Sequence, residues 1–146
     1  MAQTDNIQAF DELTGSILAR LYSAFPVPIT LKAGDFVDNP LVYSEHVQCD
    51  VASEEARFFT ATAKWLQMAG YIYLKEIDRG NLYVTNSVLT AKSLELLKVK
   101  PANLNNEASL GDQLAAATKQ GSNDAVRKAI TEVLSHGARF MLQTIN

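Results

Sequence analysis

The sequence feature that most constrains the fold is a change of apolar pattern after Gly70. Before this glycine, residues 53–70 repeat apolar side chains at the spacing of an amphipathic helix. After it come two short segments rich in β-branched and aromatic residues, 71–77 and 82–85, which flank a Gly/Asn turn at 78–81. Segments of this kind around such a turn are typical of a β-hairpin. The sequence therefore predicts a long helix followed by a small antiparallel hairpin.

The helix that precedes this hairpin has a clear start. Ser53 is a favourable N-cap, and Glu54 and Glu55 suit the positive end of the helix dipole. The spacing predicts a buried stripe on this helix. Its expected members are Phe58, Thr62, Trp65, Leu66 and Ala69.

The first third of the chain predicts a helix and a strand. Residues 7–24 form an amphipathic pattern, with Asp5 or Thr4 as the candidate cap, and Pro26 and Pro28 end it. The following segment, 27–31, is short and contains proline, so we expect an edge strand. Residues 32–37 are expected to form one short helix, whereas residues 38–52 show no clear pattern.

The last part of the chain predicts further helices. Residues 87–98 have a helical pattern, a polar linker follows at 101–106, and the remainder is typical of a helical hairpin with Gly121 between its helices. The apolar stripes of this hairpin must be buried against the rest of the chain, a second copy in a two-fold dimer, or another protein. The candidate interface residues are Leu110, Leu114, Val126, Ile130, Val133 and Leu134.

The composition is that of an ordinary globular chain with a mild acidic excess. The 146 residues suit one domain or one domain with an appendage, and the net charge is -3. Residues 1–70 carry four basic and nine acidic side chains, and residues 71–146 carry nine and seven, so their net charges are -5 and +2. This balance argues against a strongly nonspecific polyanion binder, but it does not exclude a local basic patch.

Compartment signals are few. Cys49 is the single cysteine and cannot form a disulfide within the chain, so nothing indicates an oxidising compartment. The polar, acidic start is unlike a signal peptide, and no apolar stretch approaches the length of a membrane span. We expect a cytoplasmic protein that does not associate with membranes.

The predicted order of helix, strand, short helix, long helix, hairpin and helix resembles a winged helix-turn-helix domain over residues 7–100. The segment Trp65–Ile72 is similar to the end of the family's recognition helix, where a leucine, a glycine and an apolar pair lead into the wing. The segment Leu89–Leu97 is similar to the helix that commonly follows the wing. The resemblance implies an α+β, mostly helical fold: a winged-helix domain at 1–100, then a linker and helical hairpin at 101–146.

Two features depart from the pattern of that family. Residues 38–52 are long for the turn of a helix-turn-helix, which normally has about 3–4 residues. The start of the third helix, which faces base edges in many such proteins, carries Glu54 and Glu55. Carboxylates at that position are repelled by phosphates, although glutamate can accept a hydrogen bond from cytosine.

Six polar side chains are the candidates for nucleic-acid binding. Arg57, Thr60, Lys64 and Gln67 share one outward stripe of the long helix. On this stripe, Arg57 and Gln67 are candidates for reading bases, and Lys64 is the candidate for contacting a phosphate. Lys75 and Arg79 lie on the hairpin, where a wing arginine can enter a minor groove. The alternative is an ordinary solvated helix face and an exposed turn.

Catalytic and metal-binding signals are weak. Glu45, His46, Cys49 and Asp50 cluster within six positions, but a zinc site lacks a second Cys/His pair. A nucleophilic pair of Cys49 with His46 or His136 requires convergence in space. The chain has no phosphate-binding glycine loop and no nucleophile elbow. We therefore expect no enzyme activity, no metal and no cofactor.

Two functions are compatible with these patterns. The first is a small transcription regulator that binds double-stranded DNA through residues 53–85 and dimerises through its C-terminal helices. The second is a winged-helix adaptor that binds another protein and no nucleic acid. The pI of about 5.3, the glutamates at the helix start and the apolar C-terminal hairpin favour the second.

Overall fold

Five α-helices and six short strands make up the part of the chain that the computed structural model describes, residues 5–100 and 108–145. The helices are α1 (Asn6–Ala24), α2 (Glu54–Met68), α3 (Ala91–Lys98), α4 (Leu110–Gln120) and α5 (Asn123–Ile145). The strands are β1 (Ile29–Lys32), β2 (Leu41–Ser44), β3 (Cys49–Ala52), β4 (Ile72–Tyr73), β5 (Glu76–Ile77) and β6 (Tyr83–Leu89). The fold is α+β, as predicted. None of the described helices combines the length and the apolarity that a membrane span requires.

The predicted first helix and edge strand are confirmed. The Asp5 carboxylate accepts a hydrogen bond from the Ile7 amide at 3.2 Å and caps α1. The helix ends at Ala24, just before the prolines that cannot continue it. Strand β1 follows and pairs on one side only, with β6, so it is an edge strand.

The small sheet is centred on β6, which pairs antiparallel with β1, β4 and β5. The predicted hairpin is therefore present, but its first strand is divided into β4 and β5. Its second strand continues to Leu89, so the helix predicted over 87–98 begins only at Ala91, after the N-cap Thr90. Residues 87–89 lie in the strand because Val88 and Leu89 complete the pairing with β4.

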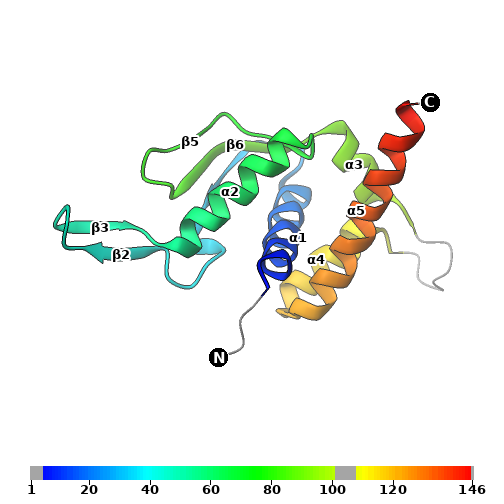
Figure 1. The fold of residues 1–146 in the computed structure, drawn as a ribbon. Helices are drawn as coiled ribbons and strands as arrows, with labels where there is room; N and C mark the ends of the chain where they lie inside the picture. The colour runs from blue at the N-terminus through cyan, green and yellow to red at the C-terminus, as the bar shows by residue number, and fades with distance from the viewer. Residues whose placement is uncertain (1–4, 101–107, 146) are drawn as a thin grey trace.

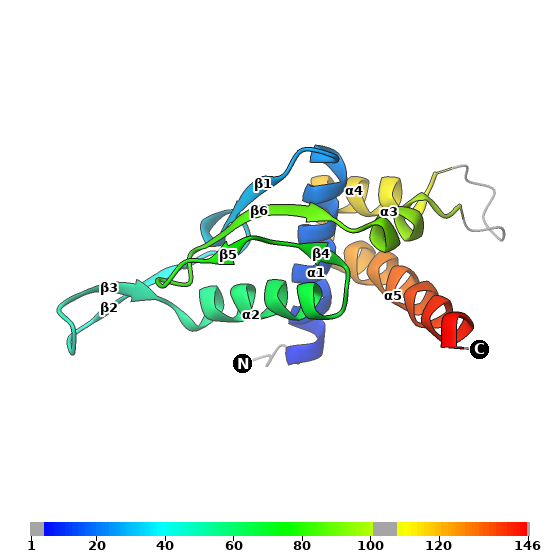
Figure 2. The same ribbon diagram turned by 90° about the horizontal axis from the view of Figure 1, so that it is seen from above.

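A second hairpin, β2–β3, occupies the segment for which the sequence indicated no element. In this hairpin Leu41 lies opposite Ala52 at one end and Ser44 lies opposite Cys49 at the other, and neither strand pairs with the main sheet. Figures 1 and 2 show it projecting from one end of the molecule, while α4 and α5 lie at the other. The predicted short helix at 32–37 shrinks to one 3₁₀ turn, Ala33–Asp35. Between α1 and α2, where every residue is described, there is thus no second α-helix of a helix-turn-helix.

The C-terminal helices pack on the rest of the chain, mainly against α1 (Figure 1). Five of the six apolar residues predicted as a dimer or partner interface are therefore buried within the chain, and for these five that prediction is corrected. These five are at most 3% exposed, and Leu134 is half-buried. One core cluster runs from Ile17 in α1 to Val133 in α5, so it crosses the boundary predicted at residues 100 and 101. The predicted linker at 101–106 lies outside the described residues.

A glycine lets α1 approach the C-terminal helices closely. A Cβ atom built on Gly15 would overlap Cγ1 of Val126 and would lie 3.3 Å from Cδ1 of Leu114. No real Cβ contact is as short as the one with Val126 would be. The glycine therefore sets the distance between α1 and α5.

Gly15→Ala is expected to lower the free energy of unfolding by about 1–2 kcal/mol. Alanine is the better helix former by about 1 kcal/mol, but the added methyl overlaps Val126 so severely that the overpacking cost lies in the upper part of the usual range, at about 2–3 kcal/mol. Denaturant unfolding measures the change. Gly34→Ala is the control, because its Cβ would meet only Pro40, at 3.8 Å. An unfolding midpoint unchanged by Gly15→Ala would contradict the close approach of the two helices.

Candidate nucleic-acid interface

The six residues predicted for nucleic-acid binding line one open groove of ≈ 790 Å³ between α2 and the β5–β6 hairpin. Four come from α2 and two from the hairpin, at positions far apart in the sequence. The groove thus joins two features that the sequence indicated separately. The residues are Arg57, Thr60, Lys64, Gln67, Lys75 and Arg79.

Helix α2 presents two cations to this groove, whereas its other two predicted residues form hydrogen bonds within the protein. Arg57 and Lys64 are exposed. Thr60, predicted to face outward, is only 3% exposed, and its single hydroxyl proton is shared between two acceptors, the Arg57 carbonyl at 3.1 Å and Oδ1 of Asn81 at 3.2 Å. Gln67 is half-buried and donates from Nε2 to the Leu74 carbonyl at 3.3 Å. Thr60 and Gln67 therefore fasten α2 to the hairpin.

The hairpin tip is shaped by two residues that the sequence pattern did not indicate as site residues. Oδ1 of Asp78 accepts hydrogen bonds from the amides of Leu82 and Tyr83 at 2.7 and 2.8 Å. Asn81 has a φ of 57°, a conformation that asparagine tolerates better than most residues. The Gly/Asn turn at 78–81 was the sequence signal that indicated this tip. Its contact with Thr60 was not visible because it joins residues 21 positions apart.

The charge of the groove is mixed, with more cations than anions. Arg57, Lys64, Lys75 and Arg79 line it together with Glu76 and Asp78. The Asp78 carboxylate is engaged by the two backbone amides of the turn. Within residues 5–100 and 108–145, none of the four cations forms an ion pair. These cations are therefore available to an anion entering the groove.

The corner between α2 and the sheet is held by the start of α3. The Thr90 hydroxyl donates to the Gly70 carbonyl at 2.7 Å, and the Lys92 ammonium donates to the Ala69 carbonyl at 2.8 Å. The same ammonium lies 4.1 Å from the centre of the Tyr71 ring. Burial lowers the pKa of Lys92 and raises the pKa of Tyr71. The two segments that carry the winged-helix resemblance thus meet at this corner.

The predicted buried stripe of α2 is confirmed at Thr62 and Leu66, whereas Ala69 is half-buried. Trp65 is 46% exposed rather than buried. Its ring packs edge-on against Phe10 and stacks on Tyr71, with centroid distances of 5.3 and 6.3 Å. Phe58 is half-buried, and the innermost aromatic residue of the helix is Phe59.

The cysteine-containing cluster lies on the projecting β2–β3 hairpin and its turn. Cys49 is exposed there, and His136 lies on α5 at the opposite end of the molecule, so these two do not form a nucleophilic pair (Figure 1). In the described part of the chain, no three His, Cys, Asp or Glu side chains are grouped to hold a metal ion. The cluster thus adds no chemistry to the α2 groove.

No protein-family model, curated protein or solved structure matches this chain.

Proposed function

We propose that this protein binds double-stranded DNA through the groove between α2 and the β5–β6 hairpin, as a small transcription regulator. One observation supports the proposal above all. Side chains selected separately on a helix face and on a hairpin converge on one groove, and four of the six are cations. Phosphate contacts dominate protein–DNA affinity, and lysine and arginine make most of them.

The proposed geometry places α2 in the major groove and the hairpin tip along the backbone. Arg57 lies in the first half of α2, from which it would contact base edges. Lys64 and Lys75 would contact phosphates on either side of the DNA major groove. Arg79, at the exposed hairpin tip, would reach an adjacent minor groove.

The arrangement of elements supports the resemblance to the winged-helix family in part. A helix, an edge strand, a long helix, a hairpin and a further helix follow one another in the expected order. The second helix of the helix-turn-helix, expected at 32–37, is only the 3₁₀ turn Ala33–Asp35, and the β2–β3 hairpin lies between that turn and α2. The proposal therefore depends on the α2 groove rather than on the whole pattern.

Lys64→Gln combined with Lys75→Gln is expected to weaken binding to a random duplex about tenfold at low salt, since two phosphate contacts are lost. The slope of log affinity against log salt should become shallower by about 2. Fluorescence anisotropy with a labelled duplex measures both. Lys119→Gln with Lys128→Gln is the matched control, because these exposed lysines lie outside the groove and carry the same charge.

Two results would refute DNA binding at this groove. One is the lack of any binding by the unmodified protein at micromolar concentration in low salt, where even nonspecific complexes form. The other is an equal loss in the groove pair and the control pair, which would indicate attraction by overall charge. The first result would favour the second candidate function, an adaptor that binds protein alone. That candidate is supported by the exposed glutamates at the start of α2.

A further inference from the structure

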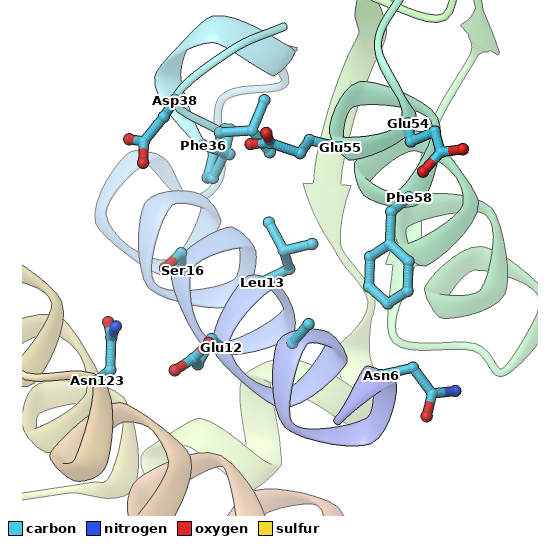
Figure 3. Close-up of a pocket in the computed structure, with 12 residues that line it drawn as sticks. Asn6, Glu12, Leu13, Ser16, Phe36, Asp38, Glu54, Glu55, Phe58 and Asn123 are labelled. Carbon is cyan, nitrogen blue, oxygen red and sulfur yellow. The ribbon is translucent and has the colours of Figure 1, made fainter. Parts of the chain in front are cut away.

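A second cleft, of ≈ 710 Å³, lies between α1, the segment after β1 and the start of α2. Figure 3 shows its apolar floor at Leu13, with Phe36 on one side and Phe58 on the other. Four carboxylates surround this floor. They are Glu12, Asp38, Glu54 and Glu55.

The acidic rim is not neutralised by the chain itself. None of the residues that line the cleft is basic. Within the described ranges, none of the four carboxylates takes part in an ion pair. Glu54 and Glu55 are exposed, and Figure 3 shows Glu55 extending from α2 toward Phe36 over the apolar floor. The cleft therefore offers uncompensated negative charge beside apolar surface.

An apolar groove continues from this cleft along α1 and α2. The two hollows share Asn6 and Phe58, and the second, of ≈ 380 Å³, is also lined by Ile7, Phe10 and Trp65. Ile7 is 60% exposed and Trp65 46%. Because Phe10 and Tyr71 both pack against the Trp65 ring, this half-exposed tryptophan is held in a fixed position. Rigid aromatic anchors of this kind often dominate binding energy at protein interfaces.

We propose that the continuous groove, acidic at one end and apolar at the other, binds a basic amphipathic segment of a partner protein. Lysine or arginine side chains of that segment would pair with Glu12, Glu54 and Glu55, and its apolar side chains would cover Ile7 and Trp65. Helices with one apolar face commonly bind such grooves. A small cation would satisfy the rim but leave the apolar half uncovered. A second copy of this chain, with net charge -3, is disfavoured by like charge.

Titration with a leucine–lysine peptide of helical pattern tests the proposal without any DNA. Trp65 is the only tryptophan of the chain, so its emission reports on the groove directly. We expect a shift of the emission to the blue with saturation at micromolar peptide. The triple variant Glu12→Gln, Glu54→Gln, Glu55→Gln should weaken binding about tenfold, because each exposed ion pair contributes a modest amount. Ile7→Ser should weaken it through loss of apolar contact.

A control variant removes the same charge elsewhere. Glu45→Gln, Asp50→Asn and Glu95→Gln lie outside both hollows and should leave peptide affinity unchanged. Equal weakening by this control, or equal binding of a leucine–glutamate peptide, would overturn the proposal.

Two further measurements identify other occupants. The same emission shift with spermine alone would assign the cleft to small cations and overturn the proposal. Concentration-dependent dimers in sedimentation that dissociate in the Glu→Gln triple variant or in Ile7→Ser would assign the groove to a second copy, which also overturns it. Because DNA is absent throughout, failure here leaves the proposed DNA-binding function untouched.

Discussion

Replacing Phe59 by alanine is expected to lower the free energy of unfolding by about 3–5 kcal/mol. Phe59 is fully buried on the inner face of α2, and its ring stacks on Phe36 with 5.0 Å between centroids. Truncation to alanine removes this contact and the apolar burial, and it leaves a cavity between α2 and the segment after β1. The melting temperature should fall by about 10 °C or more for a chain of this size.

Tyr43→Ala is the matched control for that experiment. It also truncates an aromatic residue, but Tyr43 lies on the projecting β2–β3 hairpin and is 59% exposed. Its effect should stay within about 0.5 kcal/mol, as for most surface substitutions. Thermal and denaturant unfolding of both variants measure the difference. Comparable losses in the two variants would contradict the placement of Phe59 at the centre of the core.

The sequence predicted those elements whose apolar period matches one buried face. Helix α1 presents such a face to the core at Ile17 and Leu21, and its boundaries are set by an N-cap and by prolines. The same holds for the α4–α5 hairpin, where Gly121 adopts the left-handed conformation that ends α4. In these segments local propensity, pattern and capping agree, so the prediction was correct.

The β2–β3 hairpin was missed because it obeys no burial pattern. Leu41, Val42 and Tyr43 are all exposed, so the alternation that identifies a half-buried strand is absent. Strand β6 was cut short for a related reason. Asn86 has a φ of 50°, and the register with β1 shifts nearby, so Val84 and Ser87 are both buried at a spacing of three. The period-two alternation of a strand is therefore broken after Val84.

The candidate site was predictable in its members but not in its geometry. Helical spacing identified Arg57 and Lys64 as neighbours, and these side chains are exposed as expected. The same spacing placed Thr60 outward, but its hydroxyl is bonded to Asn81 of the hairpin. A helical period specifies a face; it does not specify which later element covers part of that face. Trp65 is misassigned for the same reason, since only the packing of Phe10 and Tyr71 determines how much of its ring is covered.

Leu114→Ala is expected to destabilise the whole chain by about 2–5 kcal/mol in a single unfolding transition. Leu114 is fully buried on α4 and faces α1 beside Gly15. Because one core cluster includes α1, the sheet and both C-terminal helices, a cavity at this position weakens the entire fold. The predicted division at residues 100 and 101 leads to a different expectation: a separate module would melt first and leave the remainder intact.

Two probes of the same unfolding reaction distinguish these outcomes. Trp65 fluorescence reports on α2, far in sequence from the C-terminal hairpin, and far-ultraviolet circular dichroism reports on all helices. Coincident transitions, both shifted in Leu114→Ala, are expected for one cooperative unit. Leu41→Ala, a leucine that is 46% exposed on the β2–β3 hairpin, should shift neither curve appreciably. A Trp65 transition left in place by Leu114→Ala would establish the C-terminal helices as an independent module, because α1 and α2 would then stay folded without them.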